Sequence, residues 1–120
     1  MPRSHRLYLA DIQLALARID LLMQELDEAA FKAGAPQSDG VLFNLMTIGE
    51  AAKNIPPKIQ EQMPEIQWGE IARFRDFVVH HYFGLDMNKV WEIVHVDLPE
   101  LSRQIEILMN LLKDSDDGEE

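Results

Sequence analysis

The chain has 120 residues, of which 47% are hydrophobic and none is cysteine, and its formal net charge is −10. This length fits one small domain that buries roughly two-thirds of the surface of the unfolded chain, so neither a disulfide nor a structural metal is needed. The missing cysteines exclude zinc ribbons and thiol catalysis, and the acidic balance argues against nonspecific attraction to nucleic acid or anionic lipid. We expect a cytoplasmic protein, because no apolar run approaches the roughly 18 residues of a membrane span and no signal-like segment opens the chain.

The negative charge is concentrated at the C-terminal end. Five of the 21 acidic residues lie within residues 114–120, so residues 1–113 carry a net charge of only −5. A short segment with this composition cannot bury enough apolar surface to fold. The sequence therefore predicts one domain, residues 1–113, followed by an acidic and disordered tail, residues 114–120.

The first predicted element is one long amphipathic helix from Ser4, its N-cap, to about Phe31. Apolar residues recur three and four positions apart in two adjacent stripes. The first stripe is Leu7, Ala10, Leu14, Ala17 and Leu21, and the second is Leu9, Ile12, Leu16, Ile19, Met23 and Leu26. Two stripes form a wider apolar face than one neighbouring helix covers, so we expect this helix to contact a partner chain as well as its own bundle.

Glycine, proline and small polar residues at 32–40 predict a loop. A second helix should begin at Ser38 or Asp39 and end before Pro56, which cannot continue it. Pro57 can occupy the first turn of a short third helix, because its missing N–H would have no helical partner at that position. The middle of the chain is therefore predicted to be helical as well.

A fourth helix is predicted from Trp68 to about Tyr82, with Gly84 as its stop. Asp86 then caps a last long helix, which Pro99 should kink by removing a backbone donor. The chain shows no alternating strand pattern, no internal repeat and no glycine-rich phosphate loop. We expect an all-α bundle of four to five helices with long first and last helices.

The fourth helix carries the densest group of reactive side chains, which are Arg73, Arg75, Asp76, His80, His81 and Tyr82. Arg73, Asp76 and His80 share one helix face. We therefore expect Asp76 to accept a hydrogen bond from His80 and to favour its imidazolium form, which is a common arrangement for an acid/base histidine.

Arg75 and His80 are five residues apart, roughly 140° around an ideal helix. They can share a ligand only if the helix bends or ends, if the arginine reaches round, or if a second copy supplies the other group. A two-fold dimer would line one cleft with two copies of Arg75, Asp76 and His80, and that cleft can be locally cationic on an acidic protein. RNA is then a possible substrate.

Simpler interpretations remain open for several of these residues. Arg75, Asp76 and His80 can be a salt-bridge network on a structural helix, His81 an incidental exposed residue, and Tyr82 a tyrosine at the edge of the core. A Glu-x-x-His unit also occurs at Glu92 and His95, but the carboxylate-bridged di-iron sites built from that unit need two copies and two further glutamates. We expect neither a metal nor another cofactor.

Three residues stand as R-x4-H-x-Y: Arg75, His80 and Tyr82. Together with NLMTIGEAAK at 44–53, PEIQW at 64–68, and VWE and DLPEL within 90–101, in that order, the chain resembles the HepT-like toxins of the HEPN superfamily. The resemblance covers about residues 5–112. It implies a HEPN-type helical bundle that is homodimeric, in a family that includes metal-independent ribonucleases.

The same resemblance implies roles for the motif residues. Arg75 would bind or polarise the scissile phosphate, and His80 would handle protons as the RNA 2′-OH attacks it. Asp76 would support both, while Arg73 and His81 are possible RNA contacts. One departure is Phe43, which stands where many relatives are basic, so a cation is lost there.

In this family the toxin is usually paired with a minimal nucleotidyltransferase antitoxin that adenylylates the motif tyrosine, here Tyr82. The attached group would block the cleft by occupying the anion site of Arg75. The resemblance thus implies a ribonuclease toxin of a type VII-like toxin–antitoxin pair, acting on tRNA or mRNA. The alternative is a non-catalytic dimer that binds a nucleotide or serves as a scaffold for a nucleotidyltransferase.

Overall fold

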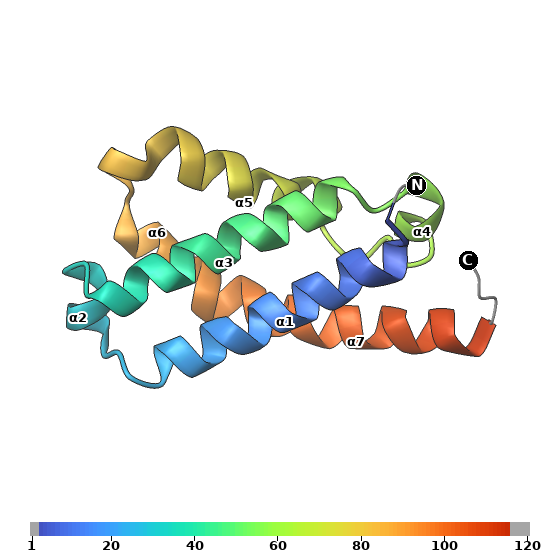
Figure 1. Cartoon of the computed structure of the whole chain (residues 1–120), viewed down its shortest axis with the longest axis horizontal. Helices are drawn as coiled ribbons and strands as arrows, with labels where there is room; N and C mark the ends of the chain where they lie inside the picture. Colours follow the sequence, from blue (N-terminus) through green and yellow to red (C-terminus); the bar gives the residue numbers. More distant parts are fainter. Residues whose placement is uncertain (1–2, 116–120) are drawn as a thin grey trace.

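A computed structural model describes residues 3–115, and every regular element in that range is helical. The elements are α1 (His5–Met23), α2 (Glu28–Lys32), α3 (Pro36–Lys53), α4 (Pro57–Gln60), α5 (Trp68–His81), the 3-10 turn η1 (Tyr82–Gly84), α6 (Met87–Glu92), the π-helical segment η2 (Ile93–Asp97) and α7 (Leu98–Ser115). Helix α3 lies between α1 and α5, and α7 runs beside α1 (Figure 1). The all-α class is confirmed. None of the described helices combines the length and the apolar character that a membrane crossing requires.

The predicted first helix is wrong beyond Met23. Its start is confirmed, because the Ser4 Oγ accepts a hydrogen bond from the backbone N–H of Arg6 at 3.1 Å. The chain turns after Met23, and Asp27 caps a new short helix by accepting a hydrogen bond from the N–H of Ala30 at 2.8 Å. The cap signal thus prevails over an apolar periodicity that continues through the turn. The break lets Phe31 fold back into the core, where its side chain is fully buried.

The predicted loop at 32–40 is shorter in the structure, because α3 already begins at Pro36 in place of Ser38 or Asp39. Pro36 takes the first helical position, where its fixed φ fits and no N–H is needed. Gly34 has a φ of 85°, a left-handed conformation that favours glycine, and so allows the tight turn between α2 and α3. Ser38 is buried inside α3, and its hydroxyl donates to the Phe31 carbonyl at 2.9 Å.

The helix in which a kink at Pro99 is predicted is irregular just before that residue, and the irregularity takes the form of a π-helical segment. Asp86 caps α6 as expected, accepting a hydrogen bond from the N–H of Asn88 at 3.0 Å. Pro99 has no N–H to give to the carbonyl four residues earlier, and the preceding turn widens so that the N–H of Leu98 bonds to the carbonyl of Ile93. The count of four to five helices is therefore too low, since both long predicted helices are divided. Helix α7 extends to Ser115, and residues 116–120 lie outside the described part of the chain.

The two apolar stripes of α1 differ in burial. Leucine and isoleucine side chains of the second stripe are buried against α3 and the rest of the bundle: Leu9, Ile12, Leu16 and Ile19. The first stripe faces outward, with Leu7, Leu14 and Leu21 exposed by 50%, 51% and 63%. The prediction of spare apolar surface on this helix is confirmed within the described structure.

Candidate functional site

Helix α5 presents the motif because its apolar residues fix its orientation. Its buried residues Trp68, Ile71, Phe74 and Val78 recur at helical spacing and face the core. The indole N–H of Trp68 donates to the Met63 carbonyl at 3.2 Å, which anchors the start of the helix. The polar residues between these positions are consequently directed outward.

Gly49 brings the backbones of α3 and α5 into direct contact at the motif arginine. A Cβ atom at position 49 would lie 2.5 Å from the backbone nitrogen of Arg75 and 2.9 Å from its Cβ. Only glycine allows this approach, because any other residue would require one helix to move. Sequence analysis points Gly49 inward but does not reveal this crossing.

The crossing places two residues of α3 beside the motif. Arg75 donates from Nη1 to Asp76 Oδ1 at 3.2 Å, and Lys53 donates from Nζ to the same oxygen at 3.3 Å. Arg75 Nε lies 3.7 Å from Glu50 Oε1. We call these four residues the charge cluster. With two cations and two carboxylates it has no net charge at neutral pH.

The hydrogen bond from Arg75, followed by that from Lys53, holds the pKa of Asp76 below its ordinary value. All four side chains are at least 38% exposed, so the ion pairs position the guanidinium more than they stabilise the fold. Glu50 and Lys53 are residues that sequence analysis did not single out. A signal existed, since both lie in the 44–53 block, one helical turn apart.

The expected hydrogen bond between His80 and Asp76 is wrong. Oδ1 of Asp76 is taken by Arg75 and Lys53, and the His80 side chain makes no hydrogen bond or ion pair within residues 3–115. His80 is exposed, and α5 is an unbroken α-helix from Arg75 to His80. A bent helix therefore does not bring these two side chains together.

The other motif-region residues lie on different surfaces. Arg73 lines a cavity of about 410 Å³ together with Lys89 and Asp97, on the side of α5 that faces α6 and η2. Burial raises the pKa of the Asp97 carboxyl in this cavity. His81 is exposed, with its Nδ1 atom 3.1 Å from the Phe77 carbonyl. Arg73 is thus separated from the charge cluster.

Apolar side chains surround the end of α5. Phe43, Val79, Tyr82 and Phe83 are exposed by 60%, 43%, 50% and 101%, and we call them the Phe43 patch. Three of them line a cavity of about 410 Å³ between α3 and α5, whose full lining is Asp39, Leu42, Phe43, Met46, Val78, Val79 and Tyr82. Tyr82 packs edge-on against Phe83, with ring centroids 5.3 Å apart. This much exposed aromatic surface is typical of an interaction site.

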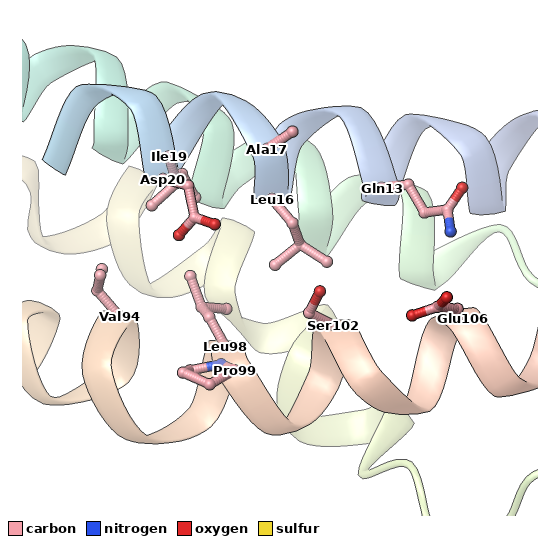
Figure 2. A pocket seen from close by; sticks show the side chains of 10 residues that line it. All are labelled: Gln13, Leu16, Ala17, Ile19, Asp20, Val94, Leu98, Pro99, Ser102 and Glu106. Atoms are coloured by element: carbon pink, nitrogen blue, oxygen red, sulfur yellow. The ribbon is translucent and has the colours of Figure 1, made fainter. Parts of the chain in front are cut away.

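A further groove, of about 380 Å³, lies between α1 and α7 and does not suit a phosphate. Figure 2 shows side chains of both helices pointing into it, with Asp20 and Glu106 as its charged groups. Its lining contains no arginine, lysine or histidine. Carboxylates without cations repel a polyanion, so the charge cluster of α3 and α5, which contains Arg75 and Lys53, is the better anion site.

The described residues contain no group of three or more histidine, aspartate or glutamate side chains placed to hold a metal ion. His95, the histidine of the Glu-x-x-His unit, stacks on Trp91 with ring centroids 4.0 Å apart. Its Nδ1 atom lies 2.9 Å from the Trp91 carbonyl. Packing against its own helix therefore accounts for the orientation of this ring.

Comparisons with known proteins agree with the motif. Residues 12–108 match the model of a family described as ribonuclease HepT-like. The chain is 40% identical over 108 residues to "Probable ribonuclease HepT" of Thermococcus cleftensis, covering 90% of this chain and 98% of the relative. It is 32% identical over 112 residues to a Methanocaldococcus jannaschii protein named as a "Putative RNase", covering 93% and 97%. A second protein of that organism with the same description is 30% identical over 119 residues, covering 98% of both chains. No solved structure matches the chain.

Proposed function

Because this chain belongs to the HepT-like ribonuclease family, we propose that it is a metal-independent endoribonuclease whose cleft is formed by α5 helices of two copies. The observation that carries the proposal is the fixed position of Arg75, held between Asp76 and Glu50 beside the crossing at Gly49. A guanidinium held in place can bind two phosphate oxygens at once and stabilise charge that develops on them.

In the proposed reaction the 2′-oxygen of RNA attacks the adjacent phosphorus and the 5′-oxygen leaves. A histidine accepts the proton of the 2′-OH and then gives a proton to the leaving 5′-oxygen, so that a 2′,3′-cyclic phosphate and a free 5′-hydroxyl result. His80 suits this role because it is exposed and its imidazole is not engaged by any described residue. Arg75 would exchange its contacts with carboxylates for contacts with the phosphate.

A dimer supplies what one chain lacks. The unbroken helix sets Arg75 and His80 roughly 140° apart, so a second copy is the simplest way to bring one residue of each type to one phosphate. Phe43 and Val79, the residues of the Phe43 patch on α3 and α5, offer apolar surface beside the motif for such an association, and Tyr82 stays outside this contact.

The test uses labelled tRNA and mRNA with the purified chain alone, in the presence of a chelator. Cleavage that yields cyclic-phosphate ends is the expected result. Intact protein mass verifies that the chain is unmodified. If this unmodified chain cuts no RNA but binds a nucleotide or a nucleotidyltransferase, the alternative holds, namely a non-catalytic dimer that binds a nucleotide or serves as a scaffold for a nucleotidyltransferase. Cleavage that the chelator abolishes would contradict the metal-independent mechanism.

Replacing Glu50 with Gln should strengthen RNA binding. Glu50 lies 3.7 Å from the Arg75 guanidinium, and its loss gives the charge cluster a net positive charge. We expect a several-fold lower Kd for single-stranded RNA at low salt, with the difference shrinking as salt rises. Fluorescence anisotropy measures both. Lys53→Met is the matched opposite change and should weaken binding, and equal affinities for the two variants would contradict the charge argument.

Tyr82 is the proposed target of a minimal nucleotidyltransferase partner that neutralises the toxin. Tyr82 is half-exposed at the turn after α5 and can be reached by another protein. Tyr82→Phe should retain RNA cleavage and escape neutralisation, as judged by growth inhibition on co-expression and by the absence of an adenylyl mass increment. The second tyrosine of the chain, Tyr8, provides the control, because Tyr8→Phe should remain fully neutralised. Neutralisation of the Tyr82→Phe variant would refute this target.

A further inference from the structure

Helix α1 carries an apolar seam on which no helix of residues 3–115 packs, although Ala17 at its edge also lines the groove between α1 and α7. Leu7, Leu14 and Leu21 are seven residues apart, and Ala10 and Ala17 lie between them. We call these five residues the α1 stripe. All of them are exposed, the leucines by 50% to 63%. Alternating steps of three and four residues are the spacing with which one helix packs along another in a coiled coil.

We propose that the α1 stripe is the contact between two copies of this chain, packed with their α1 helices antiparallel about a two-fold axis. The leucines occupy one of the two core positions of the heptad, and the alanines occupy the other. In an antiparallel pair each kind of core position lies opposite the other kind. Leu14 and Leu21 then face Ala17 and Ala10 of the other copy, and large and small side chains interlock. A parallel pair would instead set leucine opposite leucine and leave gaps between the alanines.

The register follows from charge. When Leu14 faces Ala17 of the second copy, Leu21 faces Ala10, and Leu7 lies opposite Gln24 at the end of α1. Shifting the pairing by one heptad, so that Leu14 faces Ala10, pairs Leu7 with Ala17 and leaves Leu21 without an alanine. The shifted pairing also sets the two copies of Asp11 against each other, which is unfavourable.

The favoured register pairs opposite charges at the edge of the contact. Asp11 of one copy faces Arg18 of the other, and the two-fold axis repeats the pair. Arg18 is exposed and makes no hydrogen bond or ion pair with any other residue of the range 3–115. Asp11 already accepts from Arg3 Nη1 at 2.6 Å, and its side chain is still 37% exposed. A carboxylate bonded on one side can therefore receive a second cation.

This contact is distinct from the Phe43 patch, because the α1 stripe lies on α1, whereas the patch residues lie on α3, α5 and η1. It does not depend on the proposed nuclease activity. A chain that uses both surfaces forms a tetramer, and a chain that uses only the α1 stripe forms a dimer. Assembly and RNA cleavage are measured separately, so the failure of one proposal is distinguishable from the failure of the other.

Sedimentation equilibrium of the full chain tests the contact. Leu14→Glu should halve the mass of the assembly, since it places two carboxylates next to the two-fold axis. The control is Leu111→Glu, which changes a 45% exposed leucine on α7 and should leave the mass unaltered. Circular dichroism verifies that both variants are folded. An unchanged mass for Leu14→Glu, or an equal loss for Leu111→Glu, overturns the proposal.

Orientation is tested by cross-linking, which is straightforward because the chain has no cysteine. Ala10→Cys and Leu21→Cys, which face each other in the proposed register and lie far from the two-fold axis, are prepared separately and treated with a short bifunctional maleimide, alone and after mixing. The mixture should yield far more cross-linked dimer than either variant alone. Efficient cross-linking of Leu21→Cys alone would indicate parallel helices and overturn the proposal. Arg18→Asp should raise the dissociation constant about tenfold or more, and adding Asp11→Arg should restore it.

Discussion

His80→Ala is expected to reduce RNA cleavage by a factor of about 10² to 10⁴, the usual contribution of a general acid or base. The side chain is exposed and has no hydrogen-bond partner among the described residues, so its removal disturbs no packing. The free energy of unfolding should change by less than about 0.5 kcal/mol. Single-turnover cleavage of a labelled RNA measures the first effect, and thermal unfolding measures the second.

The adjacent histidine provides the control. His81 is also exposed and belongs to the same turn of α5, but its Nδ1 atom lies 3.1 Å from the Phe77 carbonyl of its own helix. His81→Ala should lose at most a few-fold in RNA affinity and retain the rate of the chemical step. Equal losses of that rate in the two variants would show that general disturbance of the helix end, rather than proton transfer at His80, limits the reaction.

Gly49→Ala is expected to destabilise the fold and to inactivate the site together. The added methyl group would lie 2.5 Å from the backbone nitrogen of Arg75 and 3.2 Å from the Ala72 carbonyl, so α5 must move away from α3. Overpacking of this kind costs about 1–3 kcal/mol, against a gain in helix propensity of no more than about 1 kcal/mol. Denaturant unfolding should show the net loss. The rate of RNA cleavage should fall by more than the loss of folded protein explains, because Arg75 itself is displaced.

Gly69→Ala is the matched control, since Gly69 is also helical but nearly free of neighbours. Its Cβ would meet only the tip of Arg73, at 4.0 Å. The substitution should leave cleavage unchanged and stabilise the chain by up to about 1 kcal/mol. If Gly49→Ala behaves in the same way, the backbone contact at Arg75 does not constrain the site as we infer.

Much of the architecture follows from the sequence alone, because the signals involved are local. Ser4 and Asp86 cap helices where their side chains can reach free backbone N–H groups, and Pro99 disturbs the helix around it, as predicted. Apolar spacing identified α5 and placed Arg75 and His80 on it. The family resemblance rested on residues and their order, and the family is confirmed.

Only the tertiary structure decided which groups surround Arg75. Glu50 and Lys53 lie more than 20 residues before it in the chain, and they reach it because the glycine at position 49 lets two helix backbones touch. Within α5 alone, Asp76 can accept a hydrogen bond from either His80 or Arg75. In the structure it accepts from Arg75, and Lys53 of α3 donates to the same carboxylate oxygen. Periodicity also could not determine which stripe of α1 is buried. That choice depends on the packing of α3 and α7 against one side, which leaves the other stripe exposed.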